Sequence, residues 1–128
     1  MINVTISIPS AFYERGISSA LKETGDFRVV NLTGAEERDV LSACRQWNTD
    51  ILLLGISTLN GAGVQDRLPL IEKVRREYPS CRIVLILDET LSGELNEGVK
   101  RLKLTHFIDS FIYTSASMNY LVDTLETL

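Results

Sequence analysis

The sequence has few cysteines, no excess of positive charge and no long apolar run, and each shortage excludes a class of protein. Cys44 and Cys81 belong to no Cys-x-x-Cys pair or Cys/His cluster, so they indicate buried thiols in a reducing compartment rather than a disulfide framework. The apolar runs 51–55 and 83–87 are too short to cross a bilayer. The N-terminus also lacks a signal-peptide pattern. We therefore expect a cytoplasmic domain that does not bind membranes.

The charge balance argues against nucleic acid as a direct ligand. Lys and Arg number 13 and Asp and Glu number 17, which gives a formal net charge of −4. Such a chain is poorly suited to contacting a phosphate backbone. The 128 residues are 45% apolar and 23% charged, which is ordinary for a globular protein. We expect one domain, residues 1–128, with a single buried core.

Strand-like and helical patterns alternate five times along the chain. Strands are predicted over 3–8, 27–32, 51–55, 82–87 and 106–112. Helices are predicted over 11–23, 36–47, from about 68, over 91–104, and after Ser115 or Ser117. Their apolar faces include Phe12 in the first helix and Trp47 in the second. Pro69 suits the first turn of the third helix, after a loop over 56–67.

This alternation predicts a fold in which helices cover both faces of a parallel sheet. The runs 51–55 and 83–87 are unbroken and apolar, which is typical of central strands. Right-handed crossovers then give an α/β, flavodoxin-like domain with five parallel strands in the order 2-1-3-4-5. Any site is expected where strands 1, 3 and 4 end, close to Pro9, Gly55 and Asp88.

Segments distributed over the whole chain resemble the receiver domains of two-component response regulators, especially those that precede LuxR-type DNA-binding domains. The order and spacing of the segments carry the resemblance. They are FYERGI (12–17), AL (20–21), GDFRVV (25–30), TDILLL (49–54), IS (56–57), GAG (61–63), RREYP (75–79) and SAS (115–117). The loop before the third helix is a few residues longer than is usual in that family.

The resemblance implies a phosphorylation pocket whose reactive residues are substituted here. A receiver phosphorylates an aspartate after strand 3 and holds Mg²⁺ with an acidic pair after strand 1. The aspartate position is Gly55, and the pair falls on Ile8 and Pro9, which cannot ligate Mg²⁺. The hydroxyl position is Asp88, and the lysine position is Thr114, or Tyr113 with a register slip of one. Only Phe111, the aromatic of strand 5, matches the family's switch residues.

Other candidate sites are better explained as ordinary structure. His106 is the only histidine and is predicted at the amino end of the last strand, away from the pocket and without an identifiable partner. The carboxylates of Asp88 and Glu89 lack the further ligands that a cation needs. We therefore expect no catalytic residue, metal or cofactor.

Three functions are compatible with this pattern. We favour a non-phosphorylatable pseudo-receiver that acts through protein contacts. The alternatives are an authentic phosphorelay receiver with atypical residues and a small flavodoxin-like ligand-binding domain. The predicted closing helix ends with the chain, which favours an N-terminal regulatory module of a larger protein.

Two further hypotheses concern particular side chains. With no aspartate at Gly55, the Asp88 carboxylate could turn into the vacant pocket as a fixed mimic of phosphate, although a solvated carboxylate is the simpler alternative. In receivers, the fourth helix, the fifth strand and the fifth helix form the face that meets partners or dimerises. Here that face corresponds to the predicted helix over 91–104, the strand over 106–112 and the closing helix, and it is the expected interaction surface. Its candidate residues are Lys100, Arg101, Lys103, Tyr113 and Tyr120. A homodimer or an acidic protein is the expected partner.

Overall fold

The structure is a computed structural model that describes residues 1–32, 36–56, 64–87 and 93–128. Strands and helices alternate strictly along the described chain. In order, the elements are β1 (Ile2–Ser7), α1 (Ala11–Thr24), β2 (Phe27–Asn31), α2 (Glu37–Gln46), β3 (Ile51–Ile56), α3 (Val64–Glu77), β4 (Arg82–Leu87), α4 (Gly93–Leu104), β5 (Ser110–Tyr113) and α5 (Met118–Glu126).

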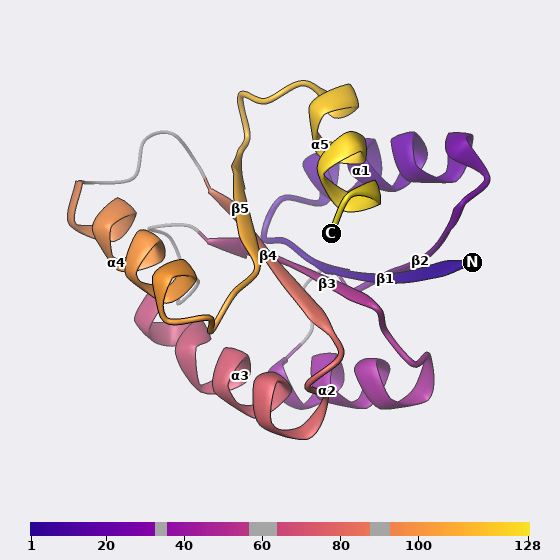
Figure 1. Cartoon of the computed structure of the whole chain (residues 1–128). Helices are drawn as coiled ribbons and strands as arrows, with labels where there is room; N and C mark the ends of the chain where they lie inside the picture. The colour runs from indigo at the N-terminus through magenta and orange to yellow at the C-terminus, as the bar shows by residue number, and fades with distance from the viewer. Residues whose placement is uncertain (33–35, 57–63, 88–92) are drawn as a thin grey trace.

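The five strands form one parallel sheet in the order β2-β1-β3-β4-β5. Helices α1 and α5 cover one face, and α2, α3 and α4 cover the other (Figure 1). The flavodoxin-like α/β fold and the strand order predicted from the sequence are both confirmed. Within the described chain, no helix combines the length and apolar character needed to cross a membrane.

The core consists of two apolar layers, because alternate residues of each central strand face opposite sides of the sheet. In β3, Ile51 and Leu53 pack under α1 and α5, whereas Leu52 and Leu54 pack under α2 and α3. All six residues of β3 are buried. Burial of each large apolar side chain contributes about 1.5–3 kcal/mol, so this strand makes a large contribution to stability.

A polar network closes the amino edge of the sheet, where β4 and β5 begin. The Asp109 carboxylate accepts hydrogen bonds from Arg75 Nη2 at 2.7 Å, from the Ile83 backbone N–H at 2.8 Å and from Arg82 Nη1 at 3.4 Å. Arg75 also donates from Nε to the Phe107 carbonyl at 3.1 Å and from Nη1 to the Cys81 carbonyl at 3.4 Å. The network therefore connects α3 to both neighbouring strands.

The predicted strand over 106–112 begins too early. His106 is exposed and has a φ of 64°, and its N–H donates to the Lys103 carbonyl. This left-handed turn ends α4. The strand starts only at Ser110, because the N–H groups of Phe107 and Ile108 still donate to the Leu102 carbonyl at the end of α4.

The predicted start of the third helix is also wrong. Helix α3 begins at Val64, within the segment expected to be a loop, and Pro69 is its sixth residue rather than part of its first turn. Pro69 lacks an N–H to donate to the Gln65 carbonyl. The apolar residues that follow it nevertheless remain buried and hold the helix against the sheet.

Two aromatic residues predicted to be on inward helical faces are exposed. Phe12 is 89% exposed in the first turn of α1, whose buried side is formed by Ile17 and Leu21 together with the polar Glu14 and Ser18. Trp47 is 40% exposed because α2 ends at Gln46 and Trp47 is only its C-terminal cap.

Candidate functional site

The carboxyl ends of β1 and β3 bring three of the predicted pocket residues together. Ser7 pairs with Leu54 in the parallel register, so Ile8 and Pro9 leave β1 beside Gly55. Ile8 is buried and Pro9 is exposed. Neither side chain offers an oxygen to a metal ion. Within the described residues, no group of three or more His, Cys, Asp or Glu side chains could hold a metal ion.

Gly55 lies against the backbone that leaves β1. A Cβ atom built on Gly55 would be 2.5 Å from Pro9 Cδ and 3.0 Å from both Ile8 Cα and Ile8 Cγ2. Real Cβ atoms essentially never approach a heavy atom within 3.0 Å. The ring of Pro9 therefore occupies the space that any side chain at position 55 would need.

Of the remaining predicted pocket residues, the structure describes Thr114 but not Asp88. Thr114 follows β5, and its N–H donates to the Leu87 carbonyl at 2.9 Å. Its own carbonyl accepts a hydrogen bond of 3.3 Å from the Tyr13 hydroxyl, which connects α1 to the end of β5. Burial raises the pKa of Tyr13. Asp88 and Glu89 lie outside the described residues, so the phosphate-mimic hypothesis remains a prediction.

A cation that the sequence analysis did not identify lies at this edge of the sheet. Arg67 of α3 reaches the end of β1, where its Nη2 donates to the Ser7 carbonyl at 3.5 Å. Its Nε is buried and has no hydrogen-bond partner in the described structure. Burial lowers the pKa of Arg67, and the neighbouring Asp66 opposes that shift. A fixed guanidinium thus adjoins the end of β1, where the resemblance would place a metal ion.

A buried acid on the opposite face of the sheet was also missed. Glu14 of α1 is 1% exposed, and its Oε1 accepts a hydrogen bond of 3.0 Å from the Leu32 N–H. Its Oε2 is buried with no partner in the described chain. Burial raises the pKa of Glu14, although the hydrogen bond from Leu32 opposes the rise. The fold therefore favours the protonated carboxyl more than water does.

The predicted interaction residues lie on α4, β5 and α5. Phe111 and Tyr113 are half-buried neighbours on β5, with ring centroids 6.0 Å apart in an edge-to-face arrangement. Lys103 Nζ lies 5.6 Å from the centre of the Phe111 ring. Such a contact between an exposed cation and a ring is worth about 0.5–1 kcal/mol. The structure thus places Lys103, one of the predicted interaction residues, against Phe111, the aromatic that matches the switch residues of receivers.

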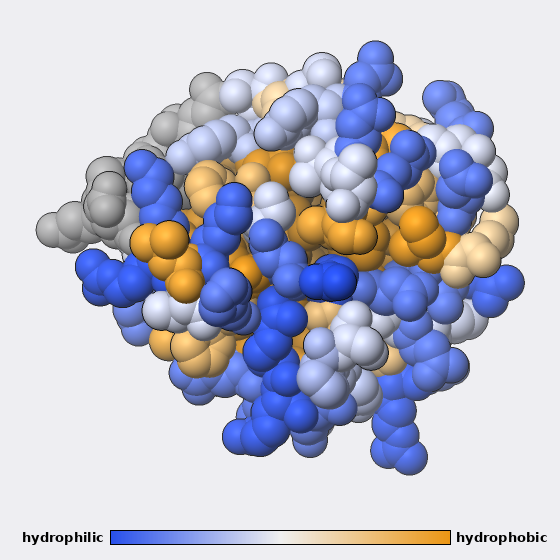
Figure 2. Space-filling view, in the orientation of Figure 1, coloured by the Kyte–Doolittle hydropathy of each residue, from blue (hydrophilic) through white to orange (hydrophobic). Residues whose placement is uncertain are grey.

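The outer part of this face combines charge with apolar surface. Lys100 and Arg101 are exposed on α4, and Tyr120 is 58% exposed on α5. Leu104, at the end of α4, is 79% exposed. Figure 2, which views α4, β5 and α5 from the front, shows orange apolar areas interspersed with blue hydrophilic groups. This mixture is suited to a protein contact.

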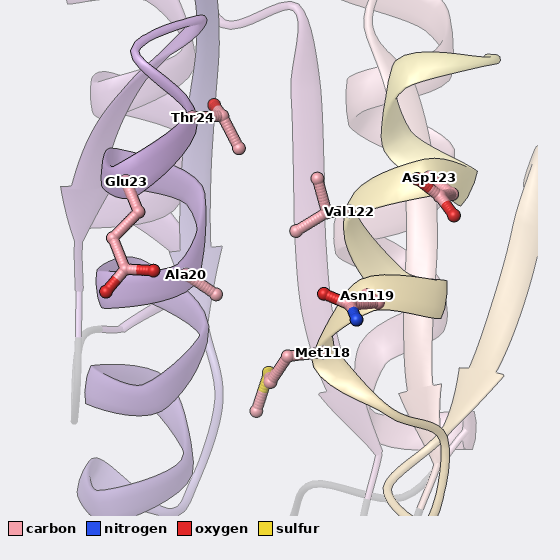
Figure 3. A pocket seen from close by; sticks show the side chains of 7 residues that line it. All are labelled: Ala20, Glu23, Thr24, Met118, Asn119, Val122 and Asp123. Carbon is pink, nitrogen blue, oxygen red and sulfur yellow. The ribbon is translucent and has the colours of Figure 1, made fainter.

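A shallow groove of about 430 Å³ lies elsewhere, between α1 and α5. Figure 3 shows Met118 and Val122 of α5 pointing toward α1, while Asp123 points away from it. The groove residues are Ala20, Glu23, Thr24, Met118, Asn119, Val122 and Asp123. All of them belong to α1 or α5, so the groove is separate from the end of β3.

Comparisons with solved structures connect this fold to known proteins. A response regulator receiver domain protein (CheY-like) from Methanospirillum hungatei JF-1 matches with a TM-score of 0.76 and 15% identity, covering 99% of this chain and 92% of that chain. A LuxR-family DNA-binding response regulator from Staphylococcus aureus matches with a TM-score of 0.77 and 14% identity, covering 99% and 98%. A chemotaxis protein from Vibrio cholerae matches with a TM-score of 0.76 and 17% identity, covering 99% and 98%.

No protein-family model and no curated protein sequence matches this chain. At identities this low, the structural matches establish the fold alone. The chain has the fold of a response regulator receiver domain, and the resemblance predicted from its sequence is confirmed at that level.

Proposed function

We propose that this domain with a receiver fold works without phosphoryl transfer and acts through protein contacts. The observation that carries the proposal is the close approach of Pro9 to Gly55. Position 55 has no nucleophile, and the space for one is filled by a rigid ring. Phosphoryl transfer to this position would require both a new side chain and a new path for the backbone that leaves β1.

The charges around β1 support the same proposal. A receiver needs a divalent cation to offset the negative charge that develops on the transferred phosphoryl group. Here the residues after β1 are Ile8 and Pro9, and the nearby Arg67 donates to the Ser7 carbonyl. The positive charge at this edge is therefore part of the protein, in a place where carboxylates would otherwise hold Mg²⁺.

The direct test is incubation with acetyl phosphate and Mg²⁺, followed by intact mass spectrometry. We expect no mass increase, whereas a phosphorylatable receiver treated in parallel gains one phosphoryl group. Stoichiometric phosphorylation of this chain would favour the authentic receiver with atypical residues and would overturn the proposal. Peptide mapping would then identify the acceptor.

We further propose that the contacts are made by the face of α4, β5 and α5, through a homodimer. Arginine and tyrosine are the residue types that most often anchor interfaces, and Arg101 and Tyr120 are both exposed there. The same face also carries acid, because Asp123 is exposed on α5, so it can complement this cationic cluster on a second copy.

Arg101→Ala combined with Tyr120→Ala is expected to weaken self-association at least about tenfold, since each anchor is worth more than about 1 kcal/mol. Light scattering over a range of concentrations measures the effect. The matched control is Arg15→Ala with Phe12→Ala, an exposed cation and aromatic on α1. A monomeric wild type would contradict the homodimer. A dimer that the Arg101/Tyr120 variant keeps, or that is lost only in the control variant, would contradict its assignment to this face.

A further inference from the structure

The two cysteines of the chain lie side by side, although 36 residues separate them in the sequence. Cys44 is on α2 and Cys81 immediately precedes β4, and both are buried in the same apolar layer, with exposures of 3% and 1%. Each thiol affects the pKa of the other. Both are free thiols.

The backbone holds this pair in place through the segment that enters β3. The Thr49 N–H donates to the Cys44 carbonyl at 3.1 Å, and the Arg82 N–H donates to the Asp50 carbonyl at 2.8 Å. Residues 49–50 thus connect the end of α2 to the start of β4. The Cys81 carbonyl accepts a further hydrogen bond from Arg75. The juxtaposition of the two thiols is therefore built into the amino edge of the sheet.

We propose that Cys44 and Cys81 form a redox pair that closes to an intrachain disulfide when the protein meets a peroxide. A Cys44 thiolate attacks one peroxide oxygen, the O–O bond breaks, and the departing hydroxide takes up a proton to leave as water. Cys81 then attacks the sulfur of the resulting sulfenic acid, the S–O bond breaks and a second water leaves. The two thiols lose two electrons, and hydrogen peroxide gains them.

The environment assigns different roles to the two sulfurs. The interaction with Cys81 lowers the pKa of Cys44, with help from Thr49 and against the effect of burial. The same interaction, together with burial, raises the pKa of Cys81. The thiolate is the reactive form. Cys44 lies in the last turn of α2, close to the exposed Trp47, so Cys44 is the thiol that meets the oxidant and Cys81 is the resolving thiol.

Access to the pair is expected to limit the rate. Both sulfurs lie beneath the surface, so the oxidant must enter when the end of α2 opens locally. That end carries Trp47, which is 40% exposed, and Asn48, which has a φ of 48°.

The experiment treats the folded protein with hydrogen peroxide and, separately, with diamide, and follows the intact mass. We expect the peroxide-treated wild type to lose the mass of two hydrogens and both thiols, measured after denaturation under acid. Dithiothreitol should restore them. The disulfide should raise Tm, because it restricts the unfolded chain.

The variants Cys44→Ala and Cys81→Ala are the matched controls. With peroxide, Cys81→Ala should retain a sulfenic acid on Cys44 that a dimedone probe captures, whereas Cys44→Ala should react more slowly. Retention of both thiols in the wild type under both oxidants would overturn the proposal. So would thiol loss only through linked dimers, or only through irreversible oxygen addition to separate cysteines.

Discussion

Gly55→Ala is expected to lower the free energy of unfolding by about 3 kcal/mol, because overpacking in a filled site typically costs that much when the neighbours cannot move aside. The new methyl group would meet Pro9 Cδ at 2.5 Å and Ile8 Cα at 3.0 Å. Both neighbours belong to the backbone or to a ring closed on it. Urea denaturation of the variant and the wild type measures the difference.

Two further variants identify the cause. Gly98→Ala adds the same methyl group to α4, where it would meet nothing within 4 Å, and is expected to stabilise the protein by roughly 0.5–1 kcal/mol. Pro9→Ala removes the ring, so combining it with Gly55→Ala should recover part of the lost stability. Equal effects of the Gly55 and Gly98 variants would show that the close approach is wrong.

Asp109→Ala is expected to have a comparable effect at neutral pH, with a loss of about 3 kcal/mol, since it leaves a largely buried arginine and a backbone N–H without their acceptor. The side chains of Asp109 and Arg75 are 17% and 21% exposed. Arg38→Ala is the control, because the bridge from Arg38 to Glu36 is 83% and 70% exposed. Such surface pairs contribute about 0–1 kcal/mol.

The effect of Asp109 should also depend on pH. Burial by itself would raise the pKa of Asp109, but the hydrogen bonds from Arg75 and the Ile83 N–H outweigh it and lower the pKa below its usual value. The carboxylate therefore stabilises the fold above the pKa of an unfolded aspartate, about 4. That contribution is lost as the pH falls through the lower pKa of the folded state. A constant difference between wild type and variant down to acidic pH would contradict this assignment.

The strand order of the sheet could be predicted from the sequence more fully than the limits of the helices and loops that connect the strands. The strand over 82–87 is found with the predicted limits, because the unbroken apolar run 83–87, bounded by polar residues, has few alternatives. The segment 106–108 was misread as strand, because its backbone N–H groups donate to carbonyls in the last turn of α4. The start of α3 was misread because a proline rule for the first turn was applied to Pro69.

That the ends of β1 and β3 lie side by side could be predicted from the strand order, but the contacts between their residues could not. The register places Pro9 beside Gly55, but only the structure reveals how closely they approach. Glu14 and Arg67 left a signal that was overlooked. Each stands three residues before a buried stripe of its helix, Ile17 and Leu21 in one case and Leu70 and Val74 in the other. The helices of this fold begin at the carboxyl ends of the strands. A charged residue in the first turns of a helix, on the same face as its buried apolar residues, therefore points toward that edge of the sheet.

The contact between Gly55 and Pro9 has a consequence for how the domain could be controlled. A steric contact carries no titratable proton, no counter-ion and no metal, so pH, ionic strength and chelators leave it unchanged. On the function proposed above, the domain has no small-molecule input at this edge that would alter its affinity for a partner. In the proposed homodimer, self-association would then follow mass action. The abundance of the protein itself would set the fraction of molecules that are dimeric.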